Sequence, residues 1–347
     1  MTISSSLNAG VAGLNGNASK LATIADNIAN ASTYGYKRAV ADFHSLVLSE
    51  GSGSYSAGGV RVTTNRLIDE RGPLVTTNNA TDLAVSGAGM LPTTMLSALD
   101  NQTASFPLSL MTTGSFRPNA EGVLTTETGM VLMGWPAETD GSVGTYPRDT
   151  VDGLEPVRVN LNQFAGDPTT KIELSINLPA TATEAGILDL TLAGGPVTVK
   201  IGALSDPNGL TQLSDSFAPV SIIKDGSPVG NLSAVEVDAN GYMHAIYDIG
   251  FTRTIYQIPL VDVPNPNGLI ALNNQAYQVS PESGSFFLWD AGAGPTGDVV
   301  GYAREESATD VAGELTRLIT TQRAYSSNAK VIQTVDEMLQ ETTNMKR

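Results

Sequence analysis

The segment from about Glu306 to Lys346 carries the longest helical pattern of the chain. It contains no Pro, and no Gly follows Gly313, so nothing in its interior would break a helix. Apolar or small residues alternate there at spacings of four and three, as in a helix whose seam faces another helix. They are Val311, Leu315, Leu318, Tyr325, Ala329 and Ile332, with Gln322 as the one polar residue in the series. After a slip the pattern resumes at Val335, Leu339, Thr342 and Met345. Such a helix is about 55 Å long, more than a small domain covers, so we predict that it has a partner.

A second helical pattern with the same spacing lies at the N-terminus. Its apolar positions are Leu7, Val11, Leu14, Ala18, Leu21, Ala25 and Ile28. Gly10, Gly13 and Gly16 interrupt it, and each costs about 1 kcal/mol relative to Ala in a helix. Such a helix is stabilised by what it packs against rather than by its propensity. We therefore predict that the two chain ends pack on each other or on the ends of neighbouring copies. The alternative is that each stripe faces an ordinary core.

The sequence between these helices is β-like, so the predicted fold class is α+β and multidomain, with paired N- and C-terminal coiled-coil helices and β-rich middle domains. We expect strands at 60–64, 82–86 and 258–263, and a hairpin turn at Asp238–Gly241. Alternating runs between 172 and 201 predict an inserted outer domain that is all-β. The predicted divisions are 1–30 with 306–347 (terminal helices), 31–70 (linker segment), 71–137 with 233–305 (discontinuous β domain) and 138–232 (insert).

Composition and charge exclude several classes of protein and site. The 347 residues include no Cys, which excludes disulfides, thiolate metal sites and cysteine nucleophiles. The net charge of −16 falls mainly in the middle of the chain, so the nearly neutral ends can pack against copies of themselves. No basic patch suits nucleic acid, no apolar run is long enough for membrane insertion, and the N-terminus lacks the pattern of a cleavable secretory signal.

Motifs for catalysis or ligand binding find little support. Gly292–Gly297 has the spelling G-x-G-x-x-G, but the residues after it predict a strand instead of the helix N-terminus that would hold a pyrophosphate. Ser221–Lys224 matches S-x-x-K without its companion motifs. The two histidines, His44 and His244, lie in unrelated segments. We therefore expect no enzyme, no cofactor and no metal site.

Motifs at both ends of the chain resemble the bacterial flagellar rod and hook proteins, which form the flagellar axial protein family. The similar segments are LATIADNIAN (21–30), STYGYK (32–37), ELTRLITTQRAY (314–325), NAKVI (328–332) and DEML (336–339). Segments 81–89 and 122–136 are similar to the first β domain of that family, whereas 138–232 aligns with nothing. The signature residues are Asn27, Asn30, Gly35, Tyr36, Gln322 and Arg323.

The resemblance implies a structural protein of the flagellum. Rod subunits of the family are mostly shorter and lack a full inserted domain, so the insert implies a hook subunit, with a basal-body rod protein as the alternative. Hook subunits polymerise into a hollow, bendable tube that transmits torque from rod to filament. The resemblance also implies type III export without a cleaved signal, and a place outside the cell. Implied partners are copies of the chain itself, rod and hook–filament junction proteins, the hook cap and the export apparatus.

The two helical stripes give the expected polymerisation interface. Its residues are Leu7, Val11, Leu14, Leu21, Ile24, Ile28, Val311, Leu315, Leu318, Tyr325, Ile332 and Leu339. On this pattern Leu318 and Leu339 belong to the seam, whereas Thr321 and Glu337 lie off it. Two other classes compete with this interpretation. An exported wall hydrolase would need a convergent cluster of titratable groups, and a surface adhesin has no reason to carry helical stripes at both ends.

Overall fold

The computed structural model of the chain describes residues 3–46, 58–99, 106–138, 141–159, 164–165, 171–177, 187–192, 195–200, 218–224 and 230–345. Between 160 and 229 only the course of the backbone is considered. The chain divides into two units. The first comprises Met1–Val159, Glu236–Met243 and Thr254–Arg347, and the second comprises Asn160–Val235 and His244–Arg253. Both terminal helices therefore belong to the first unit.

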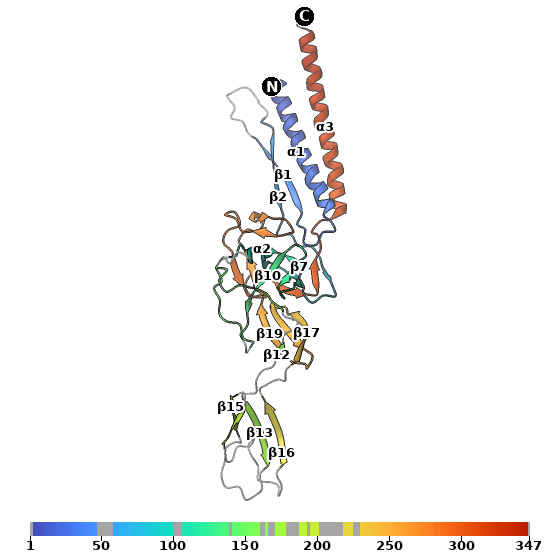
Figure 1. Cartoon of the computed structure of the whole chain (residues 1–347). Helices are drawn as coiled ribbons and strands as arrows, with labels where there is room; N and C mark the ends of the chain where they lie inside the picture. Colours follow the sequence, from blue (N-terminus) through green and yellow to red (C-terminus); the bar gives the residue numbers. More distant parts are fainter. Residues whose placement is uncertain are drawn as a thin grey trace. The chain divides into compact units, whose positions relative to one another are not determined.

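The two ends of the chain form the long helices of the first unit, as predicted. Helix α1 spans Ile3–Ala29 and α3 spans Val311–Asn344, and they lie side by side and antiparallel (Figure 1). The side chain of Asp310 caps α3 by accepting a hydrogen bond of 3.1 Å from the Ala312 amide. Helix α1 ends at Ala29, and Gly35 beyond it has a left-handed conformation with φ of +70°.

A β-hairpin lies along α1 where the sequence predicted a linker segment. Strand β1 (Ala39–Ser45) pairs antiparallel with β2 (Val60–Arg66), and Ala39 lies opposite Arg66 (Figure 1). The strand expected at 60–64 is therefore confirmed, whereas β1 was not foreseen. Most of the Gly/Ser-rich run at 51–59 lies outside the described residues. Helix α1 therefore packs against two partners within the chain, which are helix α3 and the β1–β2 hairpin.

The β domain of the first unit is built from short antiparallel strands. Its main sheet has neighbouring strands in the order β10 (Met130–Pro136), β5 (Leu91–Met95), β6 (Ser109–Met111), β22 (Tyr277–Gln278) and β21 (Ile270–Ala271). Three smaller sheets accompany the main sheet. The first has the order β24 (Asp298–Gly301), β4 (Asp82–Ser86) and β7 (Thr113–Ser115). The second pairs β20 (Leu260–Asp262) with β23 (Phe287–Trp289), and the third pairs β25 (Ala303–Glu305) with β3 (Leu74–Thr76). The remaining elements are β8 (Arg117–Pro118), β9 (Leu124–Thr125), β11 (Glu155–Pro156), α2 (Leu96–Leu99) and the 3₁₀ turn Pro266–Gly268. Strand β4 confirms the strand expected at 82–86.

One hydrophobic core joins segments of this domain that are distant in sequence. Its buried members are Ile68, Met90, Leu110, Val123, Val131, Met133, Trp135, Leu154, Val261, Val263, Leu269, Tyr277 and Leu288. Tyr146 stacks on Trp135 with ring centroids 5.7 Å apart, and Arg148 forms an ion pair of 2.8 Å with Asp290. These contacts place 141–159 with the first unit, whereas the predicted insert begins at 138.

The second unit contains a four-stranded sheet in the order β14 (Ile187–Leu192), β15 (Gly195–Lys200), β13 (Lys171–Asn177) and β16 (Ala218–Lys224). Strands β13 and β15 are parallel, and the other neighbours are antiparallel. Strand β12 (Phe164–Ala165) pairs with β17 (Gly230–Val237), whose other neighbour is β18 (Tyr242–Tyr247), followed by β19 (Thr252–Gln257). The turn at Asp238–Gly241 between β17 and β18 belongs to the first unit, and it confirms the predicted hairpin, with φ of +80° at Gly241.

Candidate functional site

The contact between α1 and α3 is formed by glycines on one side. A Cβ atom added to Gly10 would lie 3.1 Å from Cγ1 of Ile332, and one added to Gly13 would lie 2.8 Å from Nδ2 of Asn328. Gly16 faces the hairpin instead, where its added Cβ would lie 2.8 Å from Phe43. The glycines that weaken α1 as an isolated helix thus allow α3 and the hairpin to approach its backbone closely.

The buried face of α3 is polar where the sequence predicted an apolar seam. Its buried residues are Glu314, Thr321 and Val335, seven and fourteen residues apart. Thr321 is only 3 % exposed and donates a hydrogen bond of 2.7 Å to the Arg317 carbonyl, so the prediction that it lies off the seam is wrong. Thr321 can be buried because its hydroxyl is satisfied by the backbone of its own helix.

The predicted interface residues separate into two groups. Ile24 is buried, and Leu7, Leu14, Leu21, Ile28, Leu318 and Ile332 are half-buried. The exposed ones are Val11, Val311, Leu315, Tyr325 and Leu339. These five are exposed in the single chain, so the packing of α1 on α3 leaves them uncovered. Ile319, Val331 and Met338 are also exposed on α3, although the sequence pattern did not single them out. A contact with neighbouring copies remains the prediction for this surface.

Two of the signature residues fasten the end of α1 to the start of β1. The side-chain amide of Asn27 donates to the Ala39 carbonyl and accepts from the Ala39 amide, both at 2.8 Å. The Tyr36 hydroxyl donates to Asp26 at 2.9 Å and to Asn27 at 3.1 Å. Burial, followed by the hydrogen bond to Asp26, raises the pKa of Tyr36 to about 12. The signature thus encodes a fixed turn between helix and strand.

A buried ion pair joins this turn to the strand that precedes α3. The Lys37 ammonium donates to Glu305 at 2.6 Å and to the Glu70 carbonyl at 2.7 Å. The same Glu305 oxygen accepts from the Gly72 amide at 2.7 Å, and the Glu305 carbonyl accepts from the Gly35 amide at 2.7 Å. Desolvation lowers the pKa of Lys37 to about 8, and the attraction of Glu305 opposes that shift. No sequence pattern indicates this pair, because Lys37 and Glu305 are separated by 268 residues.

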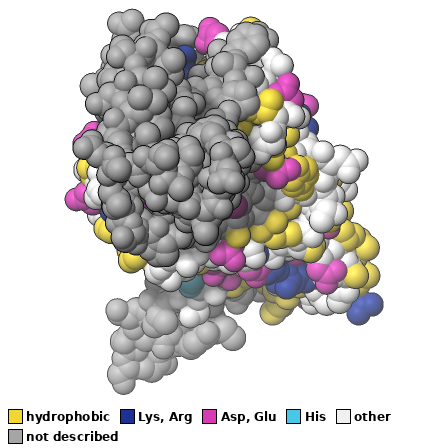
Figure 2. Space-filling view, turned by 90° about the horizontal axis from the view of Figure 1, so that it is seen from below, with side chains coloured by type: hydrophobic (Ala, Val, Ile, Leu, Met, Phe, Trp, Pro, Cys, Tyr) yellow, Lys and Arg dark blue, Asp and Glu magenta, His cyan; other side chains and the backbone are white. Residues whose placement is uncertain are grey.

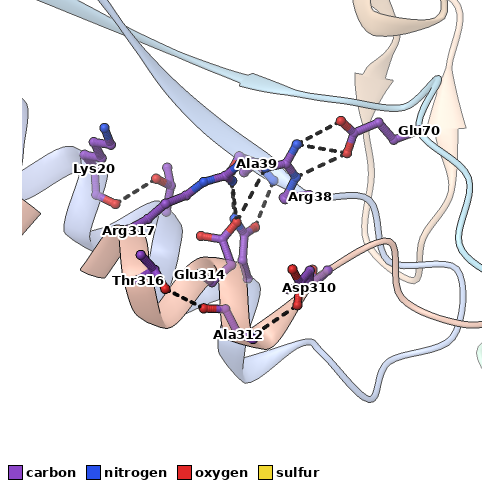
Figure 3. Close-up of polar contacts among 12 residues, drawn as sticks. Lys20, Arg38, Ala39, Glu70, Asp310, Ala312, Glu314, Thr316 and Arg317 are labelled. Carbon is purple, nitrogen blue, oxygen red and sulfur yellow. Dashed lines mark hydrogen bonds and ion pairs between the residues drawn. The ribbon is translucent and has the colours of Figure 1, made fainter. Parts of the chain in front are cut away.

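A second charged group surrounds the first turn of α3 (Figure 3). Arg38 forms a bidentate contact with Glu70, with its shortest bond at 2.8 Å, and lies 3.6 Å from the Glu314 carboxylate. Arg317 also donates to Glu314, at 2.8 Å. The pKa of Arg38 is raised, chiefly by its hydrogen bond to Glu70. Two arginines thus neutralise a carboxylate that is only 2 % exposed, and they fix where α3 begins.

The other signature residues lie at the surface or in the turn. Asn30 donates to the Asp26 carbonyl at 2.9 Å, and Gly35 is buried. Gln322 and Arg323 are exposed on α3. Their position excludes a part in the contact between α1 and α3, so a contact between copies remains a prediction for both.

Chemistry of other kinds finds little support in the described part of the chain. Gly292–Gly297 forms a turn followed by strand β24, as the sequence predicted. No group of three or more His, Cys, Asp or Glu residues that could hold a metal ion occurs among the described residues. Likewise, none of the described helices combines the length and hydrophobicity that crossing a membrane requires. On the face shown in Figure 2, acidic side chains are spread among apolar and neutral ones.

Known protein families match both ends of the chain, and a known protein matches its whole length. The family described as "Flagellar basal body rod FlgEFG protein C-terminal" matches residues 301–345, and "Flagella basal body rod protein" matches residues 7–37. The "Flagellar hook protein FlgE" of Brucella suis biovar 1 (strain 1330) is 30 % identical, and the match covers 100 % of both chains. The chain belongs to the flagellar hook protein family.

Further members of the hook protein family support this assignment. The "Flagellar hook protein FlgE" of Rhizobium meliloti (strain 1021) is 28 % identical over 100 % of both chains. A crystal structure of Helicobacter pylori flagellar hook protein FlgE2 is similar with a TM-score of 0.45 and 10 % identity, covering 68 % of this chain and 99 % of that one. That likeness is too weak to add to the assignment, which rests on the full-length relatives. These relatives favour a hook subunit over the rod alternative.

Proposed function

We propose that this hook subunit polymerises through its terminal helices into a hollow, flexible tube that transmits torque from rod to filament. The observation that carries the proposal is the set of apolar side chains left exposed on α1 and α3. They include Val11, Val311, Leu315, Ile319, Tyr325, Val331, Met338, Leu339 and Met345, with Leu315 48 % exposed and Met345 83 % exposed. Long helices with such surfaces require a partner that covers them, and copies of the same chain supply it.

The junction at the base of the helices suits a load-bearing part. The paired groups Lys37–Glu305, Arg38–Glu70 and Arg317–Glu314 tie α1, the hairpin, the β domain and α3 together. A force applied to the helices is therefore passed to the β domain through several bonds in parallel. The family is structural, and we propose no catalytic step.

The wider setting is also part of the proposal. Export through a type III channel would deliver the chain to the outside of the cell, where the hook grows beneath its cap. Rod proteins and hook–filament junction proteins would then contact the two ends of the hook. Such contacts would use the exposed, weakly charged surfaces of the helix pair.

Electron microscopy of purified full-length protein under polymerising conditions tests the proposal. Curved tubes support a hook subunit, whereas short straight rods would favour the rod alternative. Protein that remains monomeric at every concentration tried would contradict both. A parallel series with Leu315→Asp asks whether the exposed stripe is the surface that polymerises, because that variant should raise the threshold concentration.

A further inference from the structure

The carboxylate of Glu305 is hydrogen-bonded on one side only. Its Oε1 accepts from the Lys37 ammonium at 2.6 Å and from the Gly72 amide at 2.7 Å. Its Oε2 is buried and has no hydrogen-bond partner within the part of the chain that the structure describes. Nη1 of Arg71, which is also buried and also lacks a partner there, lies 4.0 Å from this oxygen. A donor and an acceptor of opposite charge therefore face each other across a gap that is too long for a hydrogen bond.

Arg71 and Glu305 belong to segments that are tied to each other by backbone hydrogen bonds. Strand β3 begins shortly after Arg71 and pairs with β25, so that Leu74 lies opposite Glu305. Next to this ladder, the Glu306 amide donates to the Pro73 carbonyl at 2.9 Å. The backbone therefore fixes the separation of the two residues, and a change in the contact between their side chains needs movement of the side chains alone.

The guanidinium of Arg71 has a pivot and space in which to move. Its Nη2 donates a hydrogen bond of 2.7 Å to the Gly89 carbonyl. The side chain also lines two cavities, with volumes of about 490 Å³ and about 170 Å³. A charge-assisted bond between nitrogen and oxygen is about 2.8 Å long. A rotation about the bond to Gly89 that moves Nη1 by about 1.2 Å would therefore close the contact with Oε2 of Glu305.

Two cations share this carboxylate, and Lys37 is the one that loses its charge first as the pH rises. Desolvation lowers the pKa of Lys37 to about 8; the attraction of Glu305 opposes that shift, and the repulsion of Arg71 adds to it. Burial lowers the pKa of Arg71 too, but from 12.5, which is well above the 10.5 of lysine. The charged and titratable groups that face the site are Lys37 and Tyr36 after α1, Arg66 on β2, Asp69, Glu70 and Arg71 before β3, Tyr277 on β22 and Glu305 on β25.

We propose that Arg71 is a stand-in cation for Lys37, which closes onto the second oxygen of Glu305 when the Lys37 ammonium releases its proton to solvent. While Lys37 is charged, it already neutralises Glu305 and repels the guanidinium, so Arg71 stays at a distance. Once Lys37 is neutral, its amine can still donate to the Glu70 carbonyl, and Arg71 supplies the missing charge. The buried carboxylate is thus paired with a cation on both sides of this change. The inference concerns the single chain, so it stands or fails independently of polymerisation.

A pH titration of the unpolymerised, isotope-labelled full-length chain tests the exchange of partners without any substitution. Carbon-detected NMR follows the side-chain signals of Lys37 and the guanidinium signals of Arg71 from pH 6.5 to 9.5. The Lys37 signals should titrate with a midpoint near pH 8. The Arg71 signals should shift with the same midpoint, because the guanidinium changes its hydrogen bonds when Lys37 loses its proton. Arg71 signals that stay constant, or that follow a different midpoint, would overturn the proposal.

Variants separate the stand-in role from a purely structural one. In Lys37→Met, the Arg71 signals at pH 6.5 should already match those that the parent reaches at pH 9.5. Arg71→Met should raise the midpoint of Lys37 by about one pH unit, since it removes a neighbouring positive charge. Arg304→Met is the matched control, because Arg304 precedes Glu305 but lies over the Tyr34 ring, 3.9 Å from its centroid. Its Lys37 midpoint should equal that of the parent.

The opposite results would contradict the proposal. They are an unchanged Lys37 midpoint in Arg71→Met, an equal shift in Arg304→Met, or Arg71 signals in Lys37→Met that match those of the parent at pH 6.5. Far-UV circular dichroism shows whether each variant keeps its helices. A variant that does not fold leaves the titration of the parent to decide.

Discussion

The Lys37 ammonium lies 2.6 Å from the Glu305 carboxylate, and neither side chain is more than 1 % exposed. Lys37 follows α1 by eight residues, and Glu305 ends the last strand before α3. One ion pair therefore fixes the inner ends of both long helices to the β domain. Arg71 lies 4.0 Å from the other Glu305 oxygen, so the loss of Glu305 leaves two cations without their carboxylate, whereas the loss of Lys37 leaves Glu305 with Arg71 alone.

Substitution of either partner should destabilise the first unit strongly. We expect Glu305→Gln, which leaves Lys37 and the nearby Arg71 without their carboxylate, to lower its free energy of unfolding by about 3–5 kcal/mol. Lys37→Met should cost less, because Arg71 remains 4.0 Å from Glu305. The double variant should lose clearly less than the sum of the two. Urea denaturation followed by tryptophan fluorescence measures this. Lys20→Met, at a more exposed lysine, is the control, and a similar loss there would argue against a special role for the buried pair.

The depressed pKa of Lys37 makes stability depend on pH in a defined window. Its pKa falls from 10.5 in the unfolded chain to about 8 in the folded one, chiefly by desolvation. Between these values the unfolded state binds more protons, so the contribution of Lys37 to stability increases as pH rises from 8 towards 10.5. It is lost again as pH falls through 8. The measurement is the difference in unfolding free energy between the parent and Lys37→Met at pH 7.5 and 9.5. A difference that stays constant over this window would contradict the shift.

Alanine at the glycines of α1 separates helix propensity from packing. On an exposed helical surface, Gly→Ala stabilises by roughly 1 kcal/mol. At Gly10 and Gly16 the added methyl group would press on Ile332 and Phe43, so we expect both variants to destabilise the helix pair and hairpin. Asn8→Ala, at an exposed position of α1, should be neutral or stabilising. Thermal melts followed at 222 nm compare the three, and stabilised glycine variants would mean that the close approach is not required.

Much of the architecture could be predicted from the sequence, because it depends on local pattern. The periodicity at both ends located α1 and α3, and a short apolar run located the strand Asp82–Ser86. The face that each helix buries could not be predicted in this way. An apolar stripe marks a surface that needs cover, but it does not say whether the cover comes from the same chain. Gly10, which looked like a weakness of α1, is the residue that decides which face α3 meets.

The junction formed by Lys37 and Glu305 could not be predicted from the sequence either. Lys37 and Glu305 are separated by 268 residues, so no local pattern couples them. The resemblance to the axial family located Asn27 and Tyr36 as signature residues without giving their roles. Their roles follow from paired contacts with Ala39 and Asp26, which only the folded chain brings together.

The last prediction contrasts two positions of α3 that the sequence pattern had assigned the other way round. Thr321 is 3 % exposed, whereas Leu315 is 48 % exposed. Thr321→Asp places a carboxylate at a buried position, which should cost several kcal/mol and reduce helicity in the monomer. Leu315→Asp should affect the monomer far less, because about half of Leu315 is already exposed to water. In the polymer, by contrast, Leu315→Asp should be costly. The new carboxylate would lie in a desolvated interface, and it would be repeated in every copy of the chain. Circular dichroism of the monomer and sedimentation of the polymer against concentration measure the two effects separately. A Leu315→Asp chain that polymerises at the parent's threshold would show that the exposed stripe is not the surface on which the tube is built.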